Sequence, residues 1–130
     1  MDSYLRFVVN TRDRNSGRRQ GLFHAAALLD RAGTFDVHET AEYYDIRQWF
    51  IDNLKRPSRF AVSARANARA MALSWFKSNS ERHIAKMRAL QRLLEAHGIS
   101  VEVLRTRRPG YVLYEDDFQI VAYPFAETST

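Results

Sequence analysis

The sequence predicts an α+β fold: a two-layer sandwich in which one mixed sheet of about five strands carries helices mainly on one face. Three observations lead to this prediction. Alternating apolar patterns lie near both ends of the chain, capped helical patterns lie between them, and Leu73–Leu104 has the pattern strand, helix, strand. The expected order is β-α-α-β-α-β-β-β. With 130 residues, we expect a single domain over residues 1–130, with a frayed tail at 126–130.

The first predicted strand covers Tyr4–Val9, where Leu5, Phe7 and Val9 alternate with other side chains. The loop 11–21, TRDRNSGRRQG, follows it. The stretch Leu22–Ala32 is rich in alanine and leucine and is predicted to be a helix, with Gly33 as its C-cap.

A second helix is predicted to begin after Asp36, because Asp36 and Glu39 have the spacing of a capping box. Tyr43, Ile46 and Phe50 fall on one face of this helix, as expected for a buried stripe. The helix is expected to end before Pro57. The segment 56–70, RPSRFAVSARANARA, has no clear period, so we expect a mobile or irregular connection there, able to become helical on a partner.

The next strand is predicted in MALSWFK, residues 71–77. Ser78 and Glu81 have capping-box spacing, and Gly98 is expected to end the helix that follows. That helix has an apolar stripe formed by Ile84, Met87, Leu90, Leu93 and Leu94.

A further strand is predicted at Ser100–Leu104. Because strand, helix and strand follow one another from Leu73 to Leu104, we expect a parallel pair with a right-handed crossover, its strands adjacent or one strand apart. Tyr111–Tyr114 and Phe118–Tyr123 flank the residues 115–117, EDD, and predict a hairpin.

Charge and composition bound the function. The net charge is +5, and a basic protein attracts polyanions. Residues 36–54 hold five acids against one base, whereas residues 55–70 hold five bases and no acid. The chain has no cysteine, which excludes disulfides, thiolate metal sites and cysteine nucleophiles. The start, MDSYLRFVVN, is unlike a signal peptide and no apolar run is long enough for a membrane helix, so we expect a cytoplasmic protein that does not contact the membrane.

The loop 11–21 is the first candidate site. Arg14, Gly17, Arg18, Arg19 and Gly21 stand where a strand gives way to a helix, so that exposed N–H groups, a helix dipole and guanidinium groups would face an anion. The loop lacks the P-loop and dinucleotide-binding signatures. The alternative is a solvated loop whose arginines pair with carboxylates.

The second candidate site is a basic arm for nucleic acid or another partner. Its contact residues are predicted to be Arg56, Arg59, Arg65, Arg69 and Lys77. The alternative is that this segment is a surface connection whose arginines pair with the acidic second helix. Few aromatic residues lie in it.

Trp75 and Phe76 are adjacent in a strand, so one is expected to face the core and the other away from it. Tyr111, Tyr114, Phe118 and Tyr123 are expected in the core. An open sheet face carrying Tyr and Arg would instead resemble an RNA-binding platform.

The four histidines, His24, His38, His83 and His97, lack metal-binding spacing and are expected to cap helices or pack. The carboxylates of Glu115, Asp116 and Asp117 are better explained by the turn than by Mg²⁺. We predict no catalytic residue, no metal site and no cofactor.

Three blocks of the sequence, GRRQGLF, SWFK and RPGYVLYEDDFQIVA, resemble those of a group of small bacterial hypothetical proteins. The resemblance covers most of the chain, and residues 34–70 fit it least. No activity is established for that group, so the resemblance implies no catalytic residues. It directs attention to Gly17–Phe23, Ser74–Lys77 and Arg108–Asp117.

Three functions are consistent with these patterns. The first is a small basic module that binds nucleic acid in a regulatory or defence setting, without catalysis. The second is a protein-interaction module, an inhibitor or adaptor that uses the acidic helix or the basic arm. The third is an enzyme whose phosphorylated substrate is held by Arg18 and Arg19, although the sequence supplies it with no nucleophile, base or metal.

Overall fold

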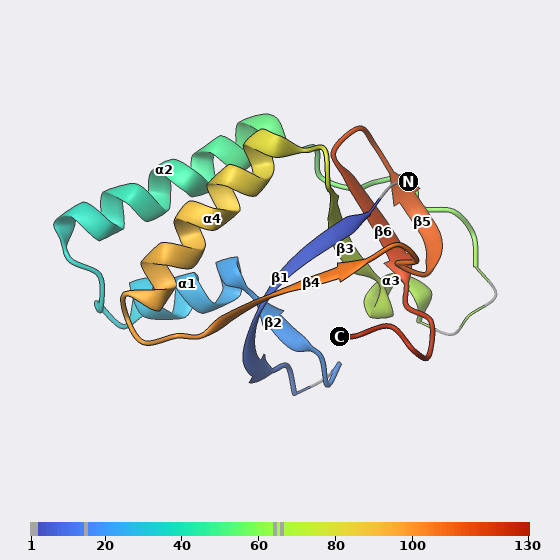
Figure 1. Ribbon diagram of the computed structural model, residues 1–130, viewed down its shortest axis with the longest axis horizontal. Helices are drawn as coiled ribbons and strands as arrows, with labels where there is room; N and C mark the ends of the chain where they lie inside the picture. Colours follow the sequence, from blue (N-terminus) through green and yellow to red (C-terminus); the bar gives the residue numbers. More distant parts are fainter. Residues whose placement is uncertain (1–2, 15, 64, 66) are drawn as a thin grey trace. The chain divides into compact units, whose positions relative to one another are not determined.

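The computed structural model describes residues 3–14, 16–63, 65 and 67–130 (Figure 1). The strands are β1 (Tyr4–Arg12), β2 (Arg19–Gly21), β3 (Leu73–Lys77), β4 (Val101–Thr106), β5 (Tyr111–Glu115) and β6 (Gln119–Tyr123). The helices are α1 (Leu22–Arg31), α2 (Val37–Asn53), α3 (Ala68–Met71) and α4 (Glu81–Glu95). The predicted α+β class is confirmed.

The sheet is antiparallel where a mixed sheet was expected. The strand order is β2-β1-β3-β6-β5, and β4 pairs with β1. The pairs β1–β2, β1–β3, β3–β6 and β5–β6 are all antiparallel. Strand β3 pairs with β1 and β6, whereas β4 pairs with β1. The strand–helix–strand pattern therefore does not make an adjacent pair, since the N-terminal strand pairs with both β3 and β4.

Contacts within the chain divide it into two compact units. The first unit comprises Met1–Arg6, Arg56–Ile84 and Val103–Thr130, and the second comprises Phe7–Lys55 and Ala85–Glu102. The strands β1 and β4 and the helix α4 each run through both units, because each unit boundary falls inside them.

The second unit is mainly helical. Helix α2 begins with the predicted capping box: the Glu39 N–H donates to Asp36 Oδ1 at 2.8 Å, and the Asp36 N–H donates to Glu39 Oε1 at 3.0 Å. Trp49, late in α2, lies under the Lys86 ammonium early in α4, and Glu39 meets His97 just after α4. The two helices therefore run antiparallel and side by side (Figure 1).

The buried stripes match the expected ones except at Ile84, which is only partly buried. Tyr43, Ile46 and Phe50 of α2 are buried, and so are Met87, Leu90, Leu93 and Leu94 of α4. Leu22, Ala25 and Ala26 bury the inner side of α1. Apolar burial of this kind is the main favourable term in folding.

The first unit is a small sheet with little helix. Strand β6 pairs with β3 on one side and with β5 on the other, and Ile120, Val121 and Ala122 of β6 are buried. Trp75 of β3 is buried and its neighbour Phe76 is partly exposed, which confirms the expected opposition of the two side chains. The described helices include none that is long and apolar enough to cross a membrane.

Three local predictions need correction. Residues 19–21 of the predicted loop form β2, because they pair back onto β1. Residues 68–71 form the short helix α3, so the next strand begins at Leu73 instead of Met71. The last long helix begins at Glu81 and Ser80 accepts its first helical bond, from the Ile84 N–H, so Ser78 and Glu81 do not form the expected capping box. Ser78 instead donates its N–H to the Ser3 carbonyl, which extends the strand pairing past β3.

Candidate nucleic-acid interface

The predicted loop 11–21 holds the end of β1, a turn and the whole of β2, which together form a hairpin. Arg12 pairs with Arg19 in the ladder, and the Asp13 N–H donates to the Arg18 carbonyl at 2.7 Å. The Gly17 N–H donates to the Asp13 carbonyl, and Gly17 has a φ of 70°, a value that favours glycine. Turn chemistry explains this part of the loop without a ligand.

The arginines of this loop are unequally available. The Arg19 guanidinium lies 3.1 Å from the Glu102 carboxylate, and Arg18 is only 8% exposed. Arg14 is exposed, and Gly21 is the N-cap of α1, with no side-chain cap. The strand–Gly–Arg–Arg–Gly–helix order is therefore present, but the two arginines expected to hold an anion are one buried and one paired.

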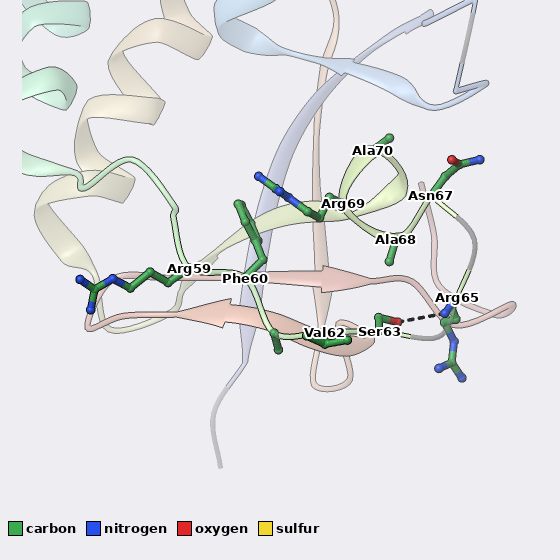
Figure 2. Close-up of a pocket in the computed structure, with 10 residues that line it drawn as sticks. Arg59, Phe60, Val62, Ser63, Arg65, Asn67, Ala68, Arg69 and Ala70 are labelled. Carbon is green, nitrogen blue, oxygen red and sulfur yellow. Dashed lines mark hydrogen bonds between the residues drawn. The ribbon is translucent and has the colours of Figure 1, made fainter.

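The segment 56–70, called the basic segment from here on, packs against the sheet of the first unit. The Ala61 N–H donates to the Leu113 carbonyl of β5 at 2.8 Å. The Arg69 guanidinium lies 4.5 Å above the centroid of the Phe60 ring (Figure 2), and that ring meets the ring of Tyr114. Residues 59–63, 65 and 67–70 line a hollow of about 730 Å³.

Arg65 lies directly over an aromatic ring of β5. Its guanidinium carbon is 3.3 Å from the centroid of the Tyr111 ring and 5.8 Å from that of Tyr123. The Tyr111 ring also meets Phe125, at 4.7 Å between centroids, and the Arg108 guanidinium lies 4.8 Å above Phe125. Two arginines thus flank a pair of aromatic rings, in the order Arg65, Tyr111, Phe125, Arg108.

We call six residues the arginine–aromatic surface, and all of them belong to the first unit. They are Phe60, Arg65, Arg69, Arg108, Tyr111 and Phe125. Within the described residues, no carboxylate lies within ion-pair distance of Arg65 or Arg69. Among the described carboxylates, Arg108 lies within ion-pair distance of Glu127 alone, at 3.7 Å, and both side chains are well exposed. A surface ion pair of that kind contributes little.

Gly110 places Tyr111 at the start of β5. Its φ is 140°, and a Cβ there would lie 1.9 Å from the Tyr123 carbonyl oxygen. Only glycine therefore allows this close approach of the two backbones. The approach seats Tyr111 opposite Tyr123 in the ladder, where both rings come within reach of Arg65.

The other predicted contact residues lie as follows. Arg56 and Arg59 are exposed, and Arg59 has a φ of 54°, which is uncommon for a residue other than glycine. Lys77 lies 2.7 Å from the Glu115 carboxylate, and this hydrogen bond raises the pKa of Lys77. Lys77 is thus already matched by a carboxylate, unlike Arg65 and Arg69.

Asp116 organises the turn between β5 and β6. It accepts hydrogen bonds from the N–H groups of Phe118 and Gln119, from the Gln119 amide and from the Tyr114 hydroxyl. Burial alone would raise the pKa of Asp116, but these hydrogen bonds lower it below its usual value. In the described part of the chain, no cluster of His, Asp and Glu side chains has the form of a metal site.

His83 and His97 both pack against aromatic rings. The His83 ring is buried and stacks on Phe118 at 4.5 Å. His97 meets Phe35 at 5.4 Å and lies 2.7 Å from the Glu39 carboxylate. Packing roles of this kind were expected for the histidines.

Comparison of the chain with protein-family models, with curated proteins and with solved structures finds no match. The resemblance of the three sequence blocks to small bacterial proteins stays a prediction. The geometry of the chain itself is therefore the guide to its function.

Sequence reasoning missed two parts of this interface. Arg108 was not predicted as a contact residue, although it stands with Arg105 and Arg107 in RTRRPG and this clustering was visible in the sequence. The place of Phe125 had no such signal, because its contact with Tyr111 depends on the pairing of β5 with β6 and on the chain turning back after Pro124.

Proposed function

We propose that this protein is a nucleic-acid-binding module that holds a single strand on the arginine–aromatic surface of its first unit. The observation that carries the proposal is the Arg65 guanidinium lying 3.3 Å over the partly exposed ring of Tyr111, with no carboxylate paired to it in the described residues. Proteins that bind single strands combine a positive backbone track with planar groups on which bases stack.

The distribution of charge supports the proposal. The first unit contains ten basic and six acidic residues, a net charge of +4, whereas the second contains ten basic and nine acidic residues, a net charge of +1. Two of the first unit's acids, Glu115 and Asp116, are engaged with Lys77 and with the β5–β6 turn. The positive field of the chain therefore originates mainly in the first unit.

A single strand fits this surface better than a duplex. Unpaired bases can stack on aromatic rings and on guanidinium planes, and both groups are present here. Reading a duplex usually places a helix in the major groove. The one helix that lies wholly within the described residues of the first unit is α3, with four residues, which is too short for that role.

Fluorescence anisotropy of labelled oligo(dT) and oligo(U) over a series of salt concentrations tests the proposal. We expect binding that weakens with salt and a double variant, Arg65→Gln with Arg69→Gln, that binds more weakly. The log–log salt slope should flatten by about 0.7 for each phosphate that the variant no longer neutralises. The matched control is Arg31→Gln with Arg92→Gln, which removes the same charge from helical positions of the second unit.

Equal weakening by the two double variants would contradict a defined surface, since net charge alone would then explain the binding. Weakening by Arg14→Gln but not by the Arg65 and Arg69 changes would place the interface at the hairpin loop instead. No binding by the wild-type protein at low salt would overturn the proposal.

The second candidate, a protein-interaction module, draws on one observation in the second unit. Val37 and Ile51 of α2 are 83% and 63% exposed, on a helix that also carries Glu42, Asp45 and Asp52. Exposed apolar side chains beside acids suit a basic protein partner. This alternative would be supported if the chain has no nucleic-acid affinity and binds a basic protein that Ile51→Glu no longer binds.

A further inference from the structure

A second cavity of the first unit lies apart from the hollow of the basic segment. Its volume is about 410 Å³, within the size range of small-molecule sites. It is lined by Trp75 of β3, by residues 105–108 and by residues 127–129.

Trp75, which lines this cavity, carries a buried hydrogen-bond donor with no acceptor in the described part of the chain. Trp75 is 1% exposed, and its indole Nε1 has no hydrogen-bond partner among the residues that the structure describes. A buried N–H without a partner costs roughly 1–3 kcal/mol, and such exceptions in native proteins call for an explanation. An acceptor atom that enters the cavity would supply the missing partner.

The remaining lining groups are almost all donors too. Arg105 and Arg107 are exposed, and no described carboxylate lies within ion-pair distance of either. The hydroxyl oxygen of Thr106 already accepts the Arg108 N–H at 3.0 Å, and that of Thr128 accepts the Phe125 N–H at 3.1 Å. Each hydroxyl therefore has its hydrogen left to donate.

The lining side chains offer more donors than acceptors, which favours a ligand that accepts. The one carboxylate in the described lining belongs to Glu127, which is 68% exposed on its side chain and lies beside Arg108. We infer that this cavity binds a phosphoryl group, with Arg105 and Arg107 holding its outer oxygens and the Trp75 N–H donating to an inner one. Guanidinium forks match phosphate geometry, and a phosphate monoester presents three acceptor oxygens against the two of a carboxylate.

This inference goes beyond the proposed binding of a nucleic-acid strand on the arginine–aromatic surface and does not depend on it. The cavity is larger than a bare phosphate ion needs, so the group is carried either by a small phosphorylated molecule or by the phosphorylated end of a nucleic-acid chain. Both sources present the same chemistry to Arg105, Arg107 and Trp75.

The indole N–H resonance of Trp75 in ¹H–¹⁵N spectra gives a direct readout, because the chain has two tryptophans and Trp49→Phe identifies the other signal. The probes are inorganic phosphate, adenosine 5′-monophosphate, and an oligo(dT) with or without a 5′-phosphate, with acetate as the carboxylate control. We expect a saturable downfield shift of the Trp75 signal with the phosphoryl probes and a much weaker response to acetate.

The variants assign the site. Arg105→Gln with Arg107→Gln should weaken phosphoryl binding roughly tenfold or more, since these changes remove charge-assisted bidentate hydrogen bonds. Trp75→Phe, with binding measured by calorimetry, should weaken it by a smaller factor. Arg82→Gln, an exposed change elsewhere in the first unit, should leave it unchanged.

The response to the different probes identifies the source of the phosphoryl group and tests the inference. A shift with the mononucleotide as large as with the phosphorylated strand identifies a small molecule as the source, whereas a shift with the phosphorylated strand alone identifies a chain end. No shift with any phosphoryl probe at millimolar concentration, or an equal response to acetate, overturns the inference. Phosphoryl binding without oligo(dT) binding would support the phosphoryl site and contradict the arginine–aromatic surface as a nucleic-acid interface. Binding of oligo(dT) without phosphoryl binding would contradict the phosphoryl site and support that interface.

Discussion

Asp116 shows how one carboxylate can organise a turn. Four donors converge on it: two backbone N–H groups, the Gln119 amide and the Tyr114 hydroxyl. The Gln119 side chain that it holds is itself buried, at 3% exposed. The three acids Glu115, Asp116 and Asp117 are thus not equivalent: the first pairs with Lys77, the second organises the turn and the third is exposed.

We expect Asp116→Asn to lower the free energy of unfolding at pH 7 by roughly 1–3 kcal/mol, because an amide accepts fewer of these hydrogen bonds. The pKa of Asp116 is lowered in the folded protein. Its contribution is therefore fully present above the unfolded-state pKa, near 3.9, and is lost as the pH falls through the folded-state value.

Urea unfolding of the wild type and of Asp116→Asn across the acid range measures this difference. The gap between them should narrow steadily below about pH 4. A gap that stays constant with pH would show that the ionised carboxylate is not what stabilises the turn. Asp117→Asn is the matched control and should change stability by about 0.5 kcal/mol or less, as surface changes do.

At the scale of elements, sequence patterns predict a helix or its buried face correctly where local spacing in the sequence determines it. The box of Asp36 and Glu39 fixes the start of α2, and the stripe through Leu90 identifies the buried face of α4. Patterns fail where a partner distant in sequence decides. Strand β2 forms by pairing back onto β1, with Arg19 opposite Arg12, and Ser78, the expected cap of α4, donates its N–H to Ser3 instead.

The same division holds for the candidate site. The basic segment was visible as a run of arginines without acids, but its aromatic partners were not. Arg65 and Tyr111 are far apart in sequence, and their stacking requires Gly110 to bring β5 against β6. The burial of Arg18 could not be read from a loop that looks entirely polar.

Leu90 provides the test of the helical layer in the second unit. It is fully buried, so Leu90→Ala should lower the free energy of unfolding by roughly 2–5 kcal/mol through reduced burial and the cavity left behind. The comparison is Leu28→Ala on α1, where the side chain is 47% exposed, and the loss there should be well below that range. Chemical denaturation measures both, and similar losses would contradict the assigned buried face.

At the scale of the whole molecule, the two units share three elements. Strands β1 and β4 and helix α4 each pass through both. We therefore expect unfolding of one unit to disrupt elements of the other. The expectation that residues 1–130 form a single domain stays a prediction, and cooperative unfolding is its natural measurement.

The two tryptophans make that measurement direct, since Trp75 belongs to the first unit and Trp49 to the second. We expect Trp49→Phe and Trp75→Phe proteins, each followed by fluorescence and by circular dichroism, to show coincident fluorescence and circular-dichroism transitions within each variant. The reason is that the shared elements couple the units. Separate midpoints for the two probes within one variant would show two domains that unfold independently.

The hydrogen bond from the Ala61 N–H to the Leu113 carbonyl has a consequence for self-association. Strand β5 ends the sheet order, and an open edge of this kind templates the addition of strands from other copies. The pairing of β5 with β6 is irregular between Val112 and Tyr114, so Leu113 lies at a bulge, and its carbonyl accepts the Ala61 N–H. The basic segment thus also covers this edge of the sheet. We expect a tryptic cut after Arg65 to divide Arg65 from Tyr111 and Phe60 from Arg69 along the chain, and to expose β5 to strands of other copies.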